Sequence, residues 1–107
     1  MSEENELLIL ARNMLGGDIG IISGARAIAE RRDYFLFHDT KLAYEDIAIF
    51  FDIDTEAKHL PIDEGARGNW DAQALQEKNE QARAIEQKYR TVVTEHCRRI
   101  IQKLGEP

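Results

Sequence analysis

Apolar residues recur at helical spacing through the last third of the chain, for roughly eight helical turns. The stripe that they form consists of Leu75, Ala82, Ile85, Tyr89, Val92, Val93, His96, Cys97, Ile100, Ile101 and Leu104. A helix over residues 70–104 contains 35 residues and is roughly 52 Å long at about 1.5 Å per residue. A compact chain of 107 residues is only about 34 Å across. We therefore expect this helix to kink, to project beyond the other helices or to be covered by a second chain, with the mostly polar residues 71–83 projecting.

Three further helices are predicted to precede it, over about residues 3–15, 18–32 and 41–58. Gly16 and Gly17 end the first helix, Asp18 is expected to cap the second, and Asn69 or Asp71 the last. Because so short a turn joins the first two helices, they are predicted to form an antiparallel hairpin. No segment reads as a strand, so the sequence predicts a single all-α domain of four helices over residues 1–107.

Glycine and aromatic residues add local expectations. Gly20 and Gly24 lie four residues apart within the predicted second helix, where glycine is unfavourable, and close approach of the backbone of the first helix is expected to compensate. The connection over residues 33–40 is expected to be irregular or partly helical. It is also expected to be packed down, because it contains four large apolar residues in a row, Tyr34, Phe35, Leu36 and Phe37.

Three residues with reactive or charged side chains are interpreted as parts of the packed structure. Cys97 lies on the apolar stripe with Val93 and Ile100, which predicts a buried structural thiol. The neighbouring His96 points about 100° away on a helix, so we expect a packed or hydrogen-bonded residue and not a base. Arg26 is expected to pair with Glu30 or with an acid of the third helix.

The charge is concentrated in one quarter of the chain. Residues 39–64 contain two basic residues, Lys41 and Lys58, and eight acidic ones, so the net charge of this segment equals the −6 of the whole chain. The acidic residues are Asp39, Glu45, Asp46, Asp52, Asp54, Glu56, Asp63 and Glu64. This pattern is typical of a solvated face or of a surface for a basic partner. The net charge argues against general binding of nucleic acids.

If the acidic segment is an interface, aromatic residues beside it would be its anchors. Trp70 precedes the last helix, and Tyr44 lies among the acids of the third. The predicted partner-binding set is Tyr44, Glu45, Asp46, Asp52, Asp54, Glu56, Asp63, Glu64 and Trp70.

A metal site is the weaker interpretation of the acidic segment. Asp52, Glu56 and His59 share one face of the predicted third helix at spacings of four and three residues. An EF-hand reading fails, because Ala57 stands where glycine is needed and Asp63 stands where glutamate is needed. A second set of ligands from another helix is also missing. No catalytic or phosphate-loop motif is present, so we expect a protein that is not an enzyme and has no cofactor.

The compartment expected from the sequence is the cytoplasm. The longest strongly apolar run, Leu7 to Ala11, is far shorter than the roughly 20 residues of a membrane span. The first six residues are acidic, whereas a secretory signal begins with basic residues. A single cysteine cannot form an internal disulfide.

Several segments of the first 70 residues resemble short, uncharacterised bacterial cytoplasmic proteins. They are Ala11-Arg12-x-Met14-Leu15-x-Gly17, Ile21-Ile22-x-Gly24-Ala25-Arg26, Phe50-Phe51-x-Ile53-x-Thr55, Leu60-Pro61 and Trp70. Proteins of this size, charge and helical content include immunity proteins, which neutralise toxins delivered by neighbouring cells. By analogy of class, the leading hypothesis is a non-enzymatic immunity protein that covers a basic toxin surface, and no functional residue is carried over. A helical homo-oligomer, such as a homodimer through the last helix, and a small metal protein are the alternatives.

Overall fold

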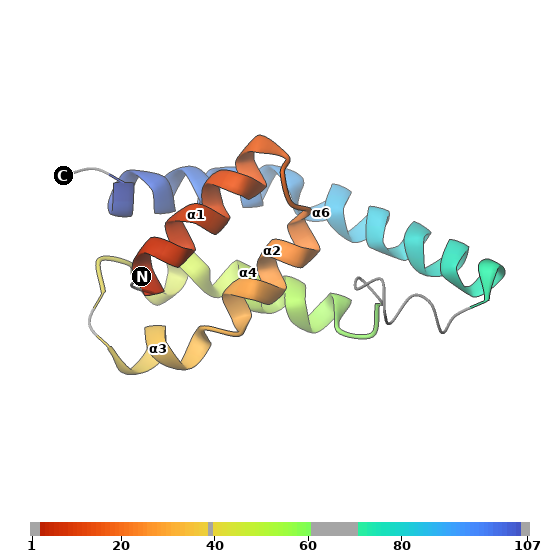
Figure 1. The fold of residues 1–107 in the computed structure, drawn as a ribbon, viewed down its shortest axis with the longest axis horizontal. Coiled ribbons are helices and arrows are strands. Elements are labelled where there is room, and N and C mark those ends of the chain that lie inside the picture. Colours follow the sequence, from red (N-terminus) through yellow and green to blue (C-terminus); the bar gives the residue numbers. More distant parts are fainter. Residues whose placement is uncertain (1–2, 39, 61–70, 106–107) are drawn as a thin grey trace.

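The computed structural model describes residues 3–38, 40–60 and 71–105, and within them the chain is helical with no strand. The helices are α1 (Glu3–Gly16), α2 (Ile21–Ala29), α3 (Arg32–Phe37), α4 (Tyr44–Ala57) and α6 (Ala72–Gly105). Figure 1 shows α1, α2 and α4 gathered along α6. The predicted all-α class is confirmed. The four predicted helices correspond to α1, α2, α4 and α6, and the short α3 lies in the connection that was expected to be partly helical.

The turn between α1 and α2 differs from the prediction. Gly17 adopts a left-handed conformation with φ of 82°, and the backbone N–H of Asp18 donates to the carbonyl of Asn13, 2.9 Å away. Asp18 therefore belongs to the end of α1, and its predicted role as the cap of α2 is wrong. Gly20 is the N-cap residue of α2 and supplies no side-chain hydrogen bond. The turn reverses the chain between the two helices (Figure 1).

The last helix begins as expected. The side chain of Asp71 accepts a hydrogen bond from the backbone N–H of Ala74 at 2.8 Å, which is the contact of an N-cap aspartate. One of the two predicted caps is thus confirmed, whereas Asn69 lies outside the described residues.

The core lies where α1, α2 and α4 meet the C-terminal two thirds of α6. The largest side chains with almost no exposure are Phe50, Leu7, Ile28, Ile47, Ile53 and Ile100. They come from all four long helices, and burial of each such side chain stabilises the fold by about 1.5–3 kcal/mol. Cys97 is also fully buried, as its position on the apolar stripe predicted.

Close approach of α1 explains the glycine inside α2. A Cβ atom on Gly24 would lie 2.2 Å from the sulfur of Met14, which is far inside van der Waals contact. The first helix does approach at this glycine, but through the Met14 side chain and not, as predicted, through its backbone. The fit locks α1 and α2 together at one point.

The N-terminal end of α6 extends beyond the other helices (Figure 1). The molecule measures 48 × 25 × 21 Å, and its longest dimension follows this helix. The buried side chains of α6 begin only at Ile85. The projection that the length of the helix predicted is therefore present at its N-terminal end. None of the helices in the described ranges is long and apolar enough to cross a membrane.

Candidate functional site

Asp46 is the most deeply buried of the predicted partner-binding residues. Only 1% of its surface is exposed, although it lies in the first turn of α4 amid exposed residues. Its side chain therefore does not lie on the surface, where the charge pattern had placed it. The carboxylate points inward, toward α6.

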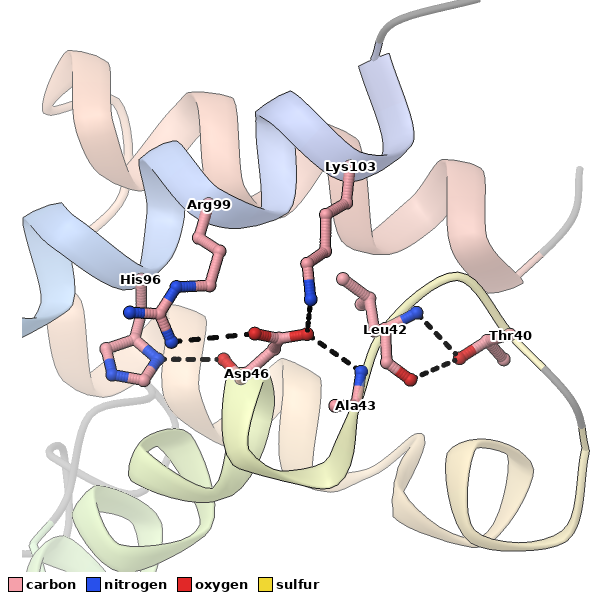
Figure 2. Close-up of polar contacts among 7 residues, drawn as sticks. All are labelled: Thr40, Leu42, Ala43, Asp46, His96, Arg99 and Lys103. Carbon is pink, nitrogen blue, oxygen red and sulfur yellow. Dashed lines mark hydrogen bonds and ion pairs between the residues drawn. The ribbon is translucent and has the colours of Figure 1, made fainter.

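Four groups surround the Asp46 carboxylate and its backbone (Figure 2). Oδ2 accepts hydrogen bonds from Lys103 Nζ at 2.6 Å and from the Ala43 backbone N–H at 2.7 Å. Oδ1 lies 3.5 Å from Nη1 of Arg99. His96 Nδ1 donates to the Asp46 carbonyl oxygen at 2.9 Å, so His96 is hydrogen-bonded as predicted. The cluster joins the start of α4 to the last turns of α6.

The electrostatics of this cluster favour a charged carboxylate. Burial alone raises the pKa of Asp46, but the hydrogen bonds from Lys103 and Ala43 and the charges of Lys103 and Arg99 outweigh it. The pKa of Asp46 therefore lies below its ordinary value. Lys103 and Ala43 both donate to Oδ2, whereas the buried Oδ1 accepts no hydrogen bond among the described residues and has only the charge of Arg99 nearby. These contacts give Asp46 a structural role, as the residue that caps α4 and anchors α6.

Two more predicted surface acids form ion pairs within the chain. Asp54 Oδ1 lies 3.3 Å from Nε of Arg26, whose Nη2 also donates to the Ala57 carbonyl oxygen at 2.9 Å. This confirms the predicted pairing of Arg26 with an acid of the third predicted helix. The contact fastens the end of α4 to α2.

Glu56 pairs with α6 instead. It accepts hydrogen bonds from the Tyr89 hydroxyl at 2.5 Å and from Lys88 Nζ at 3.1 Å. These two hydrogen bonds, that of Tyr89 first, lower the pKa of Glu56. Thus Asp46, Asp54 and Glu56 all join α4 to neighbouring helices.

The interpretation of Asp52, Glu56 and His59 as metal ligands is not supported by their positions. Within the described part of the chain, no three His, Cys, Asp or Glu side chains converge in a way that could hold a metal ion. Glu56 points to Lys88 and Tyr89, and His59 Nε2 lies 3.2 Å from the side-chain oxygen of Gln81. The three residues do not form a ligand set.

Three predicted residues remain on the surface of α4. Tyr44 is 55% exposed, and Glu45 and Asp52 are exposed as well. Neither carboxylate has a cation within 4.0 Å among the described residues. Asp63, Glu64 and Trp70, the other predicted contact residues, lie outside the described residues, as does Asp39.

The sequence interpretation missed two apolar residues on α3. Phe37 is 80% exposed and Leu36 is 44% exposed, whereas Phe35 packs against the core. The prediction that this connection packs down is therefore correct for Phe35 and wrong for Leu36 and Phe37. The sequence itself indicated that some of these side chains would be exposed. Successive residues on a helix point about 100° apart, so four apolar residues in a row cannot share one buried face.

One contact between side chains, that of Arg32 with Phe51, joins α3 to the middle of α4. The guanidinium of Arg32 lies over the ring of Phe51, 5.5 Å from its centre, and the Tyr44 ring flanks Phe51 at 5.9 Å. Tyr34 stacks on His38 at the end of α3, with ring centres 4.4 Å apart. We use the name α3–α4 surface for Leu36, Phe37, Tyr44, Glu45 and Asp52.

No protein-family model, no curated protein and no solved structure matches this chain.

Proposed function

We propose that this chain is a non-enzymatic protein-binding module that engages its partner through the α3–α4 surface. The observation that carries the proposal is the 80% exposure of Phe37, and Tyr44, shortly after it in the chain, is 55% exposed. Large exposed aromatic side chains are typical of protein interfaces, where they fill pockets on the partner. A chain with no binding role for these residues would gain solubility by replacing them.

The chemistry of the surface defines the partner. Leu36, Phe37 and Tyr44 fit an apolar recess, while the exposed carboxylates of Glu45 and Asp52 favour basic residues around it. The acidic contribution is smaller than the composition suggested, because Asp46, Asp54 and Glu56 are engaged within the chain. Apolar contact then supplies most of the affinity, and the two carboxylates raise the rate and specificity of association.

The specific form of this proposal is an immunity protein of a bacterial cytoplasm. Its partner would be a toxin domain whose basic site, such as that of a nuclease or transferase, normally binds an anionic substrate. Blocking such a site requires only tight binding and no chemistry by the inhibitor.

A photo-crosslinking experiment tests the proposal. p-Benzoylphenylalanine replaces Phe37 in one version of the protein and Ile9, an exposed residue of α1, in a matched control. Irradiation in lysate of the source cells is expected to give one dominant adduct at position 37 and not at position 9. Phe37→Asp in the otherwise natural chain is expected to abolish capture of the same protein, and raised salt is expected to weaken it.

The outcomes separate the alternatives. An adduct with a second copy of this chain would replace the proposal by homo-oligomerisation. Equal labelling at positions 37 and 9, or unchanged capture by Phe37→Asp, would show that the α3–α4 surface is not the interface. A captured toxin whose activity is inhibited by the natural chain but not by Phe37→Asp would establish the specific form.

A further inference from the structure

A groove runs between the α1–α2 turn and α6, away from the α3–α4 surface. Its larger part is a pocket of about 410 Å³ that reaches Met14, Val93 and Cys97. A second pocket of about 330 Å³ continues it along α6, and both are lined by Gly20 and Glu86. We call the two pockets together the turn groove. Each is large enough for a small organic molecule.

The accessible apolar lining of the turn groove comes from three residues around the turn, Leu15, Ile19 and Ile21, of which Leu15 is exposed and the other two are half-buried. Met14, Val93 and Cys97 lie beneath them and are each less than a tenth exposed. One wall is bare backbone. The wall contains Gly17 and Gly20, and a Cβ atom built on either glycine would meet nothing within 4 Å. The space beside the turn is therefore open, and no side chain of the described residues fills it.

The opposite wall carries unpaired charge. Arg83, Glu86 and Arg90 lie on one face of α6 at spacings of three and four residues and line the turn groove. None of the three is within 4.0 Å of an opposite charge among the described residues. Two guanidinium groups and one carboxylate give this wall a net charge of +1.

The start of α2 adds to the positive potential. Gly20, its N-cap residue, provides no side-chain acceptor, and its first turn contains no acidic residue. The first N–H groups of α2 therefore lack the capping group that usually offsets the helix dipole. This feature alone would not define a site, but it reinforces the charge supplied by Arg83 and Arg90.

We propose that the turn groove binds a small monocarboxylate with a short apolar chain. The carboxylate would pair with Arg90, and the apolar chain would lie on Leu15, Ile19 and Ile21. A single negative charge matches the net +1 of the wall, whereas a dianion such as phosphate would leave an excess negative charge beside Glu86. A neutral apolar molecule would leave both guanidinium groups without a counter-charge.

Titration with sodium octanoate, followed by amide chemical shifts, tests this proposal. We expect saturable shifts at Gly17, Gly20 and Val93, and weaker binding of 1-octanol, which has the same chain but no charge. Arg90→Gln is expected to weaken octanoate about tenfold, as loss of a charge-assisted hydrogen bond does. Arg98→Gln, which removes an exposed arginine of α6 outside the groove lining, is the matched control and should bind normally.

A steric variant provides a second test. Gly20 has an ordinary φ of −74°, and a side chain there would project into open space, so Gly20→Leu is expected to fold and to obstruct the groove. Its octanoate affinity should fall at least about tenfold, while its unfolding transition stays cooperative. Absence of saturable shifts, equal affinity of Arg90→Gln and Arg98→Gln, or normal binding by Gly20→Leu would each overturn the proposal. Arg90 is exposed, so its substitution remains informative whatever the fold of Gly20→Leu.

Discussion

Nζ of Lys103 lies 2.6 Å from Oδ2 of Asp46, although 57 residues separate the two along the chain. The contact joins the last turn of α6 to the first turn of α4, and the carboxylate is almost fully buried. The Asp46 carboxylate, which the charge pattern assigned to an acidic surface, is therefore one of the contacts that hold α4 and α6 together. Its removal should alter stability before it alters any binding.

We expect Asp46→Asn to destabilise the fold by about 2 kcal/mol, because Lys103 and Arg99 lose their counter-charge while the shape is kept. Urea unfolding at pH 7 measures the change. Glu45→Gln, which removes an exposed carboxylate from the preceding position, is the control and should change stability by less than about 0.5 kcal/mol. Equal effects of the two substitutions would contradict the structural role of Asp46.

The same carboxylate predicts a dependence of stability on pH. Because its pKa is lower in the folded chain than its ordinary value of 3.8, ionised Asp46 stabilises the fold above that value. This contribution is expected to be lost as the pH falls below about 4 and through the folded pKa. The stability difference between the natural chain and Asp46→Asn should therefore shrink between pH 6 and pH 3. A constant difference over this range would argue against a charged Asp46.

Gly24→Ala is expected to destabilise the fold by about 1–3 kcal/mol, because its Cβ would collide with the sulfur of Met14. Gly20→Ala is the control, since its Cβ would meet open space and its φ suits any residue. Combining Gly24→Ala with Met14→Ala should cost at least about 1 kcal/mol less than the sum of the single changes. Strict additivity in thermal or urea unfolding would show that the two residues do not compete for space.

Cys97 is expected to be unreactive in the folded protein. Burial leaves its sulfur inaccessible and raises the pKa of the thiol to about 11, so little thiolate exists near neutral pH. A chromogenic disulfide reagent at pH 8 should label the native chain at least about 100-fold more slowly than the chain in urea. Rapid native labelling would show that the packing around Cys97 opens frequently.

Two phenylalanines should respond in opposite ways. Phe37→Ser is expected to change the free energy of unfolding by less than about 0.5 kcal/mol, because the ring is mostly in solvent. Phe50→Ala should cost about 3–5 kcal/mol, because the Phe50 ring is fully buried. A large loss of stability in Phe37→Ser would mean that the ring is covered in solution.

The features that sequence predicted well are those set by periodic burial. The apolar stripe that includes Val93, Cys97 and Ile100 extends over many helical turns, which predicts one long helix, and α6 is such a helix. Gly24 was equally informative, because glycine inside a helix requires a local reason. Helix ends were less predictable. Asp18 and Gly20 are both acceptable N-cap residues for α2. The left-handed conformation of Gly17 places Asp18 in the turn that ends α1 and leaves Gly20 as the N-cap.

The candidate site was predicted less well. The charges along a sequence give the sign of a segment, but they do not show which group each charged side chain contacts. Asp46 and Glu45 are adjacent in the chain, yet one is buried against α6 and the other is exposed. Their difference depends on which face of α4 meets Lys103, a contact between distant residues. Phe37 was missed for a related reason. Six residues of α3 cannot bury four consecutive apolar side chains, and local composition does not reveal which of them stay outside.

The packing of α1 on α6 also affects how the chain acquires its structure during synthesis. Leu7 and Ala11 are fully buried, and α1 packs extensively along α6, which begins only at Ala72. During synthesis α1 therefore leaves the ribosome well before α6. Until α6 is made, the part of α1 that packs on α6 has no native partner, and the nascent chain exposes apolar surface that favours aggregation. Contacts between residues so far apart in sequence also slow folding compared with a bundle of neighbouring hairpins.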